Sequence, residues 1–535
     1  MYLKSVEFIP NAAMFTPPVI RKLVIGLAIT CLCAVLVSCD SGQQEVEKTS
    51  PAASVGQMDP LAIEQWADNT FGKVLAERRV SALAISVTHG DEVIFKKGYG
   101  YADWAQKKPV DPDTSQFRIG SLTKTFFGTA IAQLLERGQI DSLDDPVNKY
   151  LKRIQLENPF GDEITIWDML THQGGLEPVR TIWSSAETPR PAPPLPAEYI
   201  AEHTPPVVRQ PGTLSLYCNP CSATLGFMVE DITGQTLENY LRENIYEPLG
   251  MTHTALTNAL EAPPNIVTQY SFVDGQSPVE LRYPAITPYI SYAGDMNSTA
   301  GDMAKWIKAH IMEGQGSGSA LLQPETFKLM HTRKRGNHPD ASGFGMQFFT
   351  YDYNGEPVIE HYGSINFRSM EIMMLDKKVG VFVTMGGGGE PGADALTESA
   401  ASLEPVEGPV LPQLSHSGVR AMVLEYFLGP LPMSKDAEVD VSQYVGTYYY
   451  IPANQSQENA GEGIVVKSSG DGGLIVDGRG VYRPAGPGAF VLEGELPPET
   501  GFRDSNKYVF APAESGAMRM FAHINAGGFE KASSQ

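Results

Sequence analysis

Ser121 and Lys124 stand three residues apart, and this spacing can support nucleophilic chemistry. Apolar residues at helical spacing follow the pair and Gly138 supplies a stop, which predicts a buried helix over residues 121–137. On that helix both side chains share one face, and Ser121 lies in the first turn, where the helix dipole favours negative charge. A buried lysine with a lowered pKa can take the hydroxyl proton, so the pair is predicted to be a nucleophile and its base. Four-residue matches also arise by chance, and the surrounding sequence has to support this interpretation.

The composition describes an acidic, globular protein. The chain has 535 residues, 42% hydrophobic and 19% charged, which predicts two domains plus flanking segments. Its formal net charge is -22, and no stretch is dense in Lys and Arg. This balance excludes a nucleic-acid partner, and we interpret the acidity as a contribution to solubility.

The N-terminal segment is predicted to direct export. Arg21 and Lys22 precede an apolar run over residues 23–37, which is too short for a comfortable membrane span but typical of a secretory signal. The next residues, Leu36-Val37-Ser38-Cys39, resemble the lipobox of bacterial lipoproteins, which implies lipid attachment at Cys39 and anchoring in the cell envelope. An ordinary cleaved signal or an uncleaved anchor is the alternative. We therefore expect a signal peptide over 1–39 and a flexible tether over 40–58.

The segments around Ser121 indicate a known superfamily. A predicted β-hairpin over 81–95 precedes the helix, and short helices alternating with glycine turns follow it up to Leu176. Together they resemble the serine β-lactamase and penicillin-binding-protein superfamily, in particular its class C, esterase and D-stereospecific peptidase branch. The resemblance implies an α/β (α+β) catalytic domain over 59–400, in which helices and an all-helical subdomain flank a central antiparallel sheet.

A second motif, Tyr217-Cys218-Asn219, resembles the Tyr-x-Asn motif of that branch. The resemblance implies that Tyr217 acts beside Lys124 as general base and that Asn219 orients the acyl side of the substrate. A buried tyrosine with a satisfied hydroxyl is the alternative for Tyr217 taken alone. Pro220 suits the first position of a following helix, with Asn219 as its N-cap.

A third motif, His361-Tyr362-Gly363-Ser364, precedes two predicted antiparallel strands over 369–375 and 379–385. It resembles the Lys-Thr-Gly strand of β-lactamases, with His361 where those enzymes carry lysine. The resemblance implies that His361 and Gly363 bind substrate, and that the N–H groups of Ser364 and Ser121 form an oxyanion hole. A surface histidine before a turn is the alternative.

Two cysteines remain in the folded part of the chain, Cys218 and Cys221, because the other three belong to the signal. We expect no disulfide framework and interpret both as small buried apolar residues, with a redox pair as the alternative. Two thiols without a neighbouring His or Cys cannot complete a tetrahedral zinc site, so no metal is expected.

Proline and glycine mark the remaining organisation. The proline-rich stretch 186–211 is predicted to be a surface loop. Residues 401–440 read as a connector with one helix over 419–427, and 441–535 contain short strands separated by turns. These strands predict a small β-barrel or sandwich, and the opening Val445-Gly446-Thr447-Tyr448 resembles a lipocalin-like accessory domain.

The sequence thus predicts a serine hydrolase that forms an acyl-serine on esters or amides, with no metal or cofactor. The substrate would be a small molecule or peptide. A neutral histidine at position 361 makes recognition of a carboxylate less assured, which favours an esterase or D-amino-acid peptidase over an efficient β-lactamase. The alternative is a catalytically silent envelope lipoprotein that binds peptidoglycan or a protein partner.

Overall fold

The computed structural model describes most of the chain after residue 57. The described ranges are 58–77, 80–177, 191–257, 263–271, 279–280, 285–316, 321–365, 367–386, 415–434, 439–451, 463–478, 480–494, 507–513, 515–522 and 529–532. The predicted signal peptide with Cys39 and residues 40–57 of the predicted tether lie outside them. No helix within these ranges has the length and apolar character that a membrane crossing requires.

Within the described residues, nine strands form one antiparallel sheet in the order β3-β2-β1-β14-β13-β12-β11-β10-β9. The predicted hairpin is confirmed as the pair β1 and β2, and the two predicted later strands as β13 and β14. The bounds are β1 Ala82–His89, β2 Glu92–Asp103, β3 Lys108–Pro109, β9 Arg335–Gly336, β10 Gly343–Phe344, β11 Phe349–Tyr353, β12 Glu356–Ile365, β13 Phe367–Met374 and β14 Val379–Gly386.

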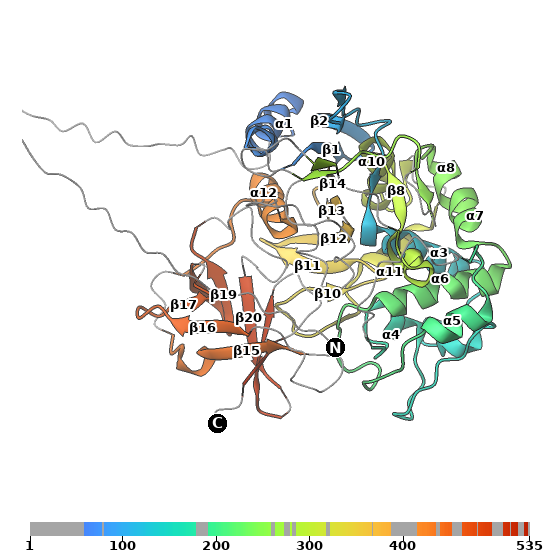
Figure 1. The fold of residues 1–535 in the computed structure, drawn as a ribbon. Coiled ribbons are helices and arrows are strands. Elements are labelled where there is room, and N and C mark those ends of the chain that lie inside the picture. The colour runs from blue at the N-terminus through green and yellow to red at the C-terminus, as the bar shows by residue number, and fades with distance from the viewer. Residues whose placement is uncertain are drawn as a thin grey trace, which may run out of the picture. The chain divides into compact units, whose positions relative to one another are not determined.

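The central strands of the sheet are buried on both faces, and alternate residues of β1 enter different cores. Ala82 and Ala84 pack with the core that contains α3, α6 and α10, whereas Leu83 and Ile85 pack with the core that contains α1 and α12. Figure 1 shows the sheet between these two groups of helices. The helices are α1 Pro60–Ala67, α2 Lys73–Ala76, α3 Thr123–Glu136, α4 Ile166–Leu170, α5 Ala197–His203, α6 Asn219–Thr233, α7 Leu237–Leu241, α8 Glu247–Leu249, α9 Pro288–Gly294, α10 Ala300–Ile311, α11 Pro324–His331 and α12 His416–Leu428.

The helix predicted to follow Ser121 is confirmed with a different start. Gly120–Leu122 form a short 3₁₀ turn, and the α-helix begins at Thr123. Gly120 has φ of +59°, a conformation that residues with a Cβ adopt at a cost. Because nearly every side chain of α3 is buried, the tertiary core rather than an exposed amphipathic face stabilises this helix.

The chain enters this helix from a strand of a small sheet. Its described strands lie in the order β4-β8-β5, with bounds Phe117–Arg118, Met296–Ser298 and Ala255–Leu256. β8 leads into α10, whose N-cap Thr299 accepts the N–H of Asp302. A further two-stranded pair, β6 and β7, joins Tyr270–Ser271 to Val279–Glu280.

The proline-rich stretch and the predicted connector both contain helices. α5 occupies seven residues within 186–211, a length that the prolines on either side allow. Val419, Val423 and Phe427 of α12 pack into the core that also contains Leu83 of β1. The chain after the sheet therefore returns to complete one of its two cores.

The C-terminal part is a closed β-barrel, one of the two predicted architectures. The barrel consists of the described strands β15 Gly446–Tyr450, β16 Ile464–Ser468, β17 Leu474–Val476, β18 Val481–Gly486, β19 Ala489–Leu492, β20 Lys507–Pro512, β21 Met518–Ala522 and β22 Phe529–Lys531. Alternating residues such as Tyr448, Tyr482 and Phe510 share its core. The mixed α/β class with a small all-β C-terminal domain is thus confirmed, whereas the lipocalin-like assignment remains a prediction.

A buried carboxyl group lies between the sheet and the helices. Glu371 of β13 is fully buried, and desolvation raises its pKa to about 8. Its Oε2 accepts the N–H of Trp306 at 3.0 Å, and its Oε1 lies 3.0 Å from Thr125 Oγ1. The Thr125 hydroxyl is also 2.8 Å from the Leu122 carbonyl oxygen and has a single proton to donate. A protonated Glu371 that donates to Thr125 satisfies all of these groups.

We predict that this carboxyl group makes stability depend on pH. Because the folded pKa of Glu371 exceeds its unfolded value, the folded state binds the extra proton, and the free energy of unfolding falls as pH rises from about 4.5 to about 8. The slope is at most about 1.4 kcal/mol per pH unit. Glu371→Gln places an amide donor where the O–H was and is expected to flatten this slope, measured by urea unfolding at several pH values. Identical slopes in the variant and the wild type would contradict the prediction.

Candidate active site

Ser121 and Lys124 meet at the start of α3. Lys124 Nζ lies 2.9 Å from Ser121 Oγ and donates to the carbonyl oxygen of Ala293 at 2.7 Å. Lys124 has no exposed surface, and desolvation lowers its pKa well below 10.5. Ser121 keeps partial exposure. A neutral amine in this position directs its lone pair at the Ser121 hydroxyl while its own N–H groups bind the backbone.

The carbonyl partner of Lys124 is held in place by a buried ion pair. Arg118 Nη2 lies 3.0 Å from Asp295 Oδ1, and neither side chain is exposed. Arg118 precedes Ser121 by three residues and Asp295 follows Ala293 by two, so the pair joins the two segments that meet at the amine. Breaking such a pair leaves an uncompensated buried charge, which gives this connection a structural role.

Tyr217 lies beside the lysine. Lys124 Nζ is 5.1 Å from the centroid of the Tyr217 ring. The phenol oxygen is shielded from solvent, and desolvation raises its pKa well above 10, although an interaction with the Ser121 side chain opposes that rise. The structure therefore brings Ser121, Lys124 and Tyr217 into one cluster, in which the Tyr217 hydroxyl makes no hydrogen bond within the described residues.

The predicted oxyanion donors are backbone groups at the junction of the 3₁₀ turn and β12. A Cβ on Gly120 would lie 3.1 Å from the Ser364 nitrogen. A Cβ on Gly363 would collide with the Ile119 carbonyl oxygen and lie 2.8 Å from the Ser121 nitrogen. The two glycines thus permit the close approach that places the Ser121 and Ser364 N–H groups next to one another.

The edge of β12 that carries His361 extends beyond β11 beside Ser121. β11 pairs with β12 only as far as Glu360, and residues 361–365 continue past the end of β11. An extended substrate can add to such an edge through main-chain hydrogen bonds. The strand is fixed by α12: His416 Nε2 bonds the Gly363 carbonyl oxygen at 2.9 Å, and Arg420 forms a buried ion pair with Glu360 at 2.6 Å.

His361 itself is fully buried and uncharged at neutral pH. Desolvation, with the field of Lys124, lowers its pKa well below 6.5. Its Nδ1 lies 2.8 Å from the Tyr362 carbonyl oxygen and therefore carries the proton, which leaves Nε2 as an acceptor. The ring centroid is 6.1 Å from that of Tyr217, so His361 belongs to the same cluster as the serine, lysine and tyrosine.

Asn219 lies at the N-terminus of α6, but its predicted role as N-cap is wrong. Cys218 rather than Asn219 is the N-cap, and its Sγ accepts the N–H of Cys221 at 3.1 Å. Asn219 is the first helical residue and Pro220 the second, because the chain enters the helix one residue earlier than the proline predicts. The partly exposed Asn219 remains two residues from Tyr217.

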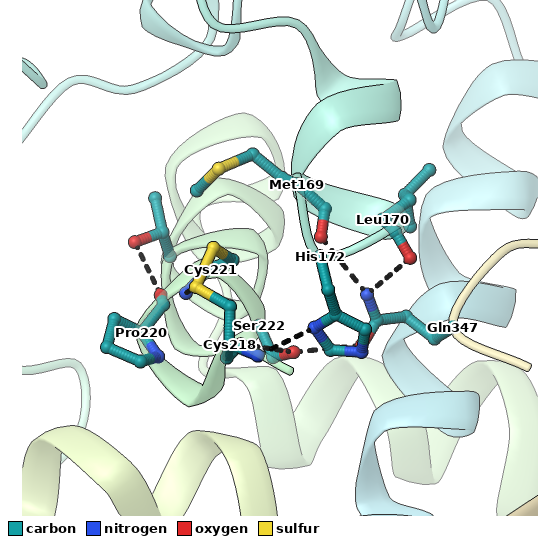
Figure 2. The surroundings of a disulfide bond; sticks show 9 residues. Met169, Leu170, His172, Cys218, Pro220, Cys221, Ser222 and Gln347 are labelled. Atoms are coloured by element: carbon teal, nitrogen blue, oxygen red, sulfur yellow. Dashed lines mark hydrogen bonds between the residues drawn. A yellow bond between two sulfur atoms is a disulfide. The ribbon is translucent and has the colours of Figure 1, made fainter. Parts of the chain in front are cut away.

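The prediction for the cysteines was wrong. Cys218 and Cys221 form a disulfide across the first turn of α6, and both are buried (Figure 2). The bond joins the N-cap to the third residue after it, where a side chain normally caps the helix by hydrogen bonding. Two cysteines three residues apart at a helix start are compatible with this bond, but a reduced pair has the same sequence pattern.

Sequence reasoning also missed three groups that surround the motif residues. They are His172, whose Nδ1 accepts the Cys218 N–H at 3.1 Å, the Ala293 carbonyl and His416. Ala293 acts through its backbone and His416 lies in the predicted connector, so neither has a side-chain pattern that marks it. His172 follows directly on a predicted helix before Gly174, which a search for buried histidines near glycine turns could have found.

Comparison with known proteins shows the family of this chain. The family model described as Beta-lactamase matches residues 67–403. This chain belongs to the beta-lactamase family. "Putative penicillin-binding protein PbpX" of Bacillus subtilis (strain 168) is 28% identical over 333 residues, 62% of this chain and 77% of the relative. "Protein flp" of Staphylococcus aureus (strain NCTC 8325 / PS 47) is 24% identical over 327 residues, and the match spans 62% of its length.

Solved structures share the fold. The octameric penicillin-binding protein homologue from Pyrococcus abyssi has a TM-score of 0.54 and 24% identity, covering 88% of this chain and 100% of its own. EstCE1, a hydrolase with promiscuous acyltransferase activity, has a TM-score of 0.51 and 19% identity, covering 61% of this chain and 94% of its own. The family places the protein in a serine hydrolase superfamily, and the solved neighbours show the architecture on which that chemistry is built.

We predict that the disulfide contributes locally to stability. Closing a four-residue loop is worth about 2 kcal/mol in the chain-entropy account. Replacing both cysteines, Cys218→Ser with Cys221→Ser, should lower the free energy of unfolding by about that amount and retain the fold, because serine is a good N-cap. The measurement is urea unfolding with and without reductant. Reductant should weaken the wild type and leave the double variant unchanged; a peptide map with both thiols free in the oxidised wild type would refute the bond.

Proposed function

We propose that this protein is a serine hydrolase that cleaves ester or amide bonds through an acyl-serine intermediate. One observation carries the proposal: a fully buried lysine amine lies 2.9 Å from the hydroxyl of a partly exposed serine. Burial favours the neutral amine, and a neutral amine is a base. A structural lysine would instead be expected at the surface or in an ion pair.

Acylation begins when the Ser121 oxygen attacks the carbonyl carbon of a substrate bound along β12. Lys124 and Tyr217 take the hydroxyl proton and pass it to the leaving group, which departs as an alcohol or amine. The N–H groups of Ser121 and Ser364 stabilise the tetrahedral oxyanion, a contribution of roughly 3 to 4 kcal/mol per donor in comparable sites. Asn219, the first residue of α6, orients the acyl group.

Deacylation uses the same groups in reverse. With the leaving group gone, water takes its place and gives a proton to the Tyr217 and Lys124 pair as it attacks the acyl carbon. The bond to Ser121 breaks, the proton returns to its oxygen, and the acid leaves. Each group therefore acts once as base and once as acid, without a metal or cofactor.

The charges in the site favour substrates that are recognised without a carboxylate group. The residue at the Lys-Thr-Gly position, His361, is buried and its pKa lies well below 6.5, so it is neutral at neutral pH. A fixed cation for a β-lactam or peptide carboxylate is thus missing from this position. We propose an esterase or D-amino-acid peptidase in preference to an efficient β-lactamase, and small esters or D-aminoacyl amides as the substrate class.

We further propose that the protein works in the cell envelope as a lipoprotein anchored through Cys39. The support is the lipobox-like sequence and the disulfide between Cys218 and Cys221, since structural disulfides persist in oxidising compartments. A membrane surface and a small-molecule or peptide substrate are then its partners.

The test is covalent labelling and turnover in one purified sample. A fluorescent fluorophosphonate is expected to label the wild type, and Ser121→Ala should abolish labelling and lower kcat for p-nitrophenyl esters by more than about 10⁴-fold. Ser515→Ala is the matched control, because Ser515 is an exposed serine in a turn of the barrel. It should label like the wild type.

Two results would overturn the proposal. Labelling and turnover that survive Ser121→Ala would assign the activity to another residue. A folded wild type that neither labels nor turns over esters, D-aminoacyl amides or nitrocefin would favour the catalytically silent binding protein. Nitrocefin turnover far above ester turnover would reverse the substrate order alone.

A further inference from the structure

His172 holds the peptide segment on both sides of Tyr217. Its backbone oxygen accepts the N–H of Leu216 at 3.0 Å, and its Nδ1 accepts the N–H of Cys218 at 3.1 Å. Figure 2 shows the imidazole directed at Cys218. One residue therefore binds the N–H groups immediately before and after the predicted general base.

The imidazole also contacts the tyrosine ring. The centroids of His172 and Tyr217 are 4.6 Å apart with the planes tilted by 33°, and Phe344 packs on His172 edge-on at 4.7 Å. The ring is fully buried between these neighbours. Rotation of the Tyr217 side chain would require the imidazole to move with it.

The protonation state of His172 is fixed. Because Nδ1 accepts a backbone N–H, the ring proton lies on Nε2. Desolvation, reinforced by the field of Lys124, lowers the pKa of His172 to about 3. The imidazole therefore stays neutral over the working pH range and keeps the same acceptor at all times, as a support requires and a proton carrier does not.

The backbone of His172 is in the left-handed region. Its φ is +59°, a conformation that glycine adopts most readily and that histidine, like asparagine and aspartate, adopts more often than other residues with a Cβ. Histidine is therefore compatible with this turn while it supplies an imidazole acceptor next to Tyr217.

The turn that carries His172 is tied to the helix that follows Tyr217. Gln347 Nε2 donates to the Leu170 carbonyl oxygen at 2.8 Å, and Gln347 Oε1 accepts the Ser222 hydroxyl of α6 at 2.9 Å (Figure 2). The disulfide then joins Cys218 to the same first turn. These contacts fix the turn of His172 next to the segment 216–218 that it binds.

From these contacts we infer that His172 is a positioning residue that sets the Tyr217 hydroxyl against Ser121 and Lys124. This inference rests on the proposed hydrolase function, in which Tyr217 moves a proton in the transition state. A displacement of about 1 Å at such a group can cost roughly 100-fold in rate. Loss of the imidazole acceptor should therefore lower kcat and leave KM nearly unchanged.

Two substitutions that both tolerate positive φ isolate the side-chain acceptor. His172→Asn keeps an oxygen at the place of Nδ1, whereas His172→Gly keeps the backbone conformation and removes the acceptor. With p-nitrophenyl esters, His172→Gly is expected to lower kcat about 100-fold with KM within roughly threefold of the wild type, and His172→Asn to remain within about tenfold in kcat. His331→Asn is the control, because it removes another buried neutral imidazole outside the site and should leave kcat unchanged.

Each outcome decides the inference. Equal kcat in the Gly and Asn variants, or a loss well beyond tenfold in the Asn variant, would overturn it. The second result applies even where the Gly variant does not fold. Loss of activity in His331→Asn equal to that of His172→Gly would assign the effect to general destabilisation and would also overturn it. Wild-type protein without turnover would remove the proposed function first, and that result is seen before any variant is compared.

Discussion

The arrangement of the catalytic site depends on the burial of the Lys124 amine. Lys124 is enclosed by the core of α3, and no carboxylate within the described residues forms an ion pair with it. Taking a charged ammonium out of water without a counter-ion costs several kcal/mol, so the group lowers that cost by releasing its proton. Burial thereby favours the neutral amine, whose partners are a backbone oxygen and the Ser121 hydroxyl.

The architecture serves this arrangement from two directions. From one side, the small sheet of β4, β8 and β5 and the Arg118–Asp295 pair bring the Ala293 carbonyl to the amine. From the other side, α12 holds β12 through His416, so that Gly363 can lie against the turn that carries Ser121. Segments more than 290 residues apart in the sequence meet at the site. Each segment is fixed by buried polar contacts rather than by apolar packing alone.

Much of this could be predicted from the sequence, because several features are local. Helical spacing after Ser121 and β-type alternation in β1, β13 and β14 depend on neighbouring residues, and the structure confirms those elements. The disulfide was missed because two nearby cysteines have the same pattern whether reduced or bonded. The N-cap of α6 was misplaced by one residue, because asparagine is a common N-cap and cysteine is not, whereas here the Cys218 Sγ accepts the Cys221 N–H.

The contributions of His172, Ala293 and His416 could not be predicted, because each depends on distant segments meeting. For the same reason, the sequence argument could only assume that burial lowers the pKa of Lys124. Its pKa depends on which groups surround the amine in three dimensions, and the structure supplies that environment.

The direct test of the account is the pKa of Lys124 in the folded protein. Protein labelled with ¹³C at lysine Cε can be titrated by NMR, with Lys124→Arg to assign the resonance. We predict a titration midpoint well below the ordinary lysine value of about 10.5, because the buried amine loses its hydration. A midpoint at or above that ordinary value would show that Lys124 is charged when folded, and would contradict its role as the base for Ser121.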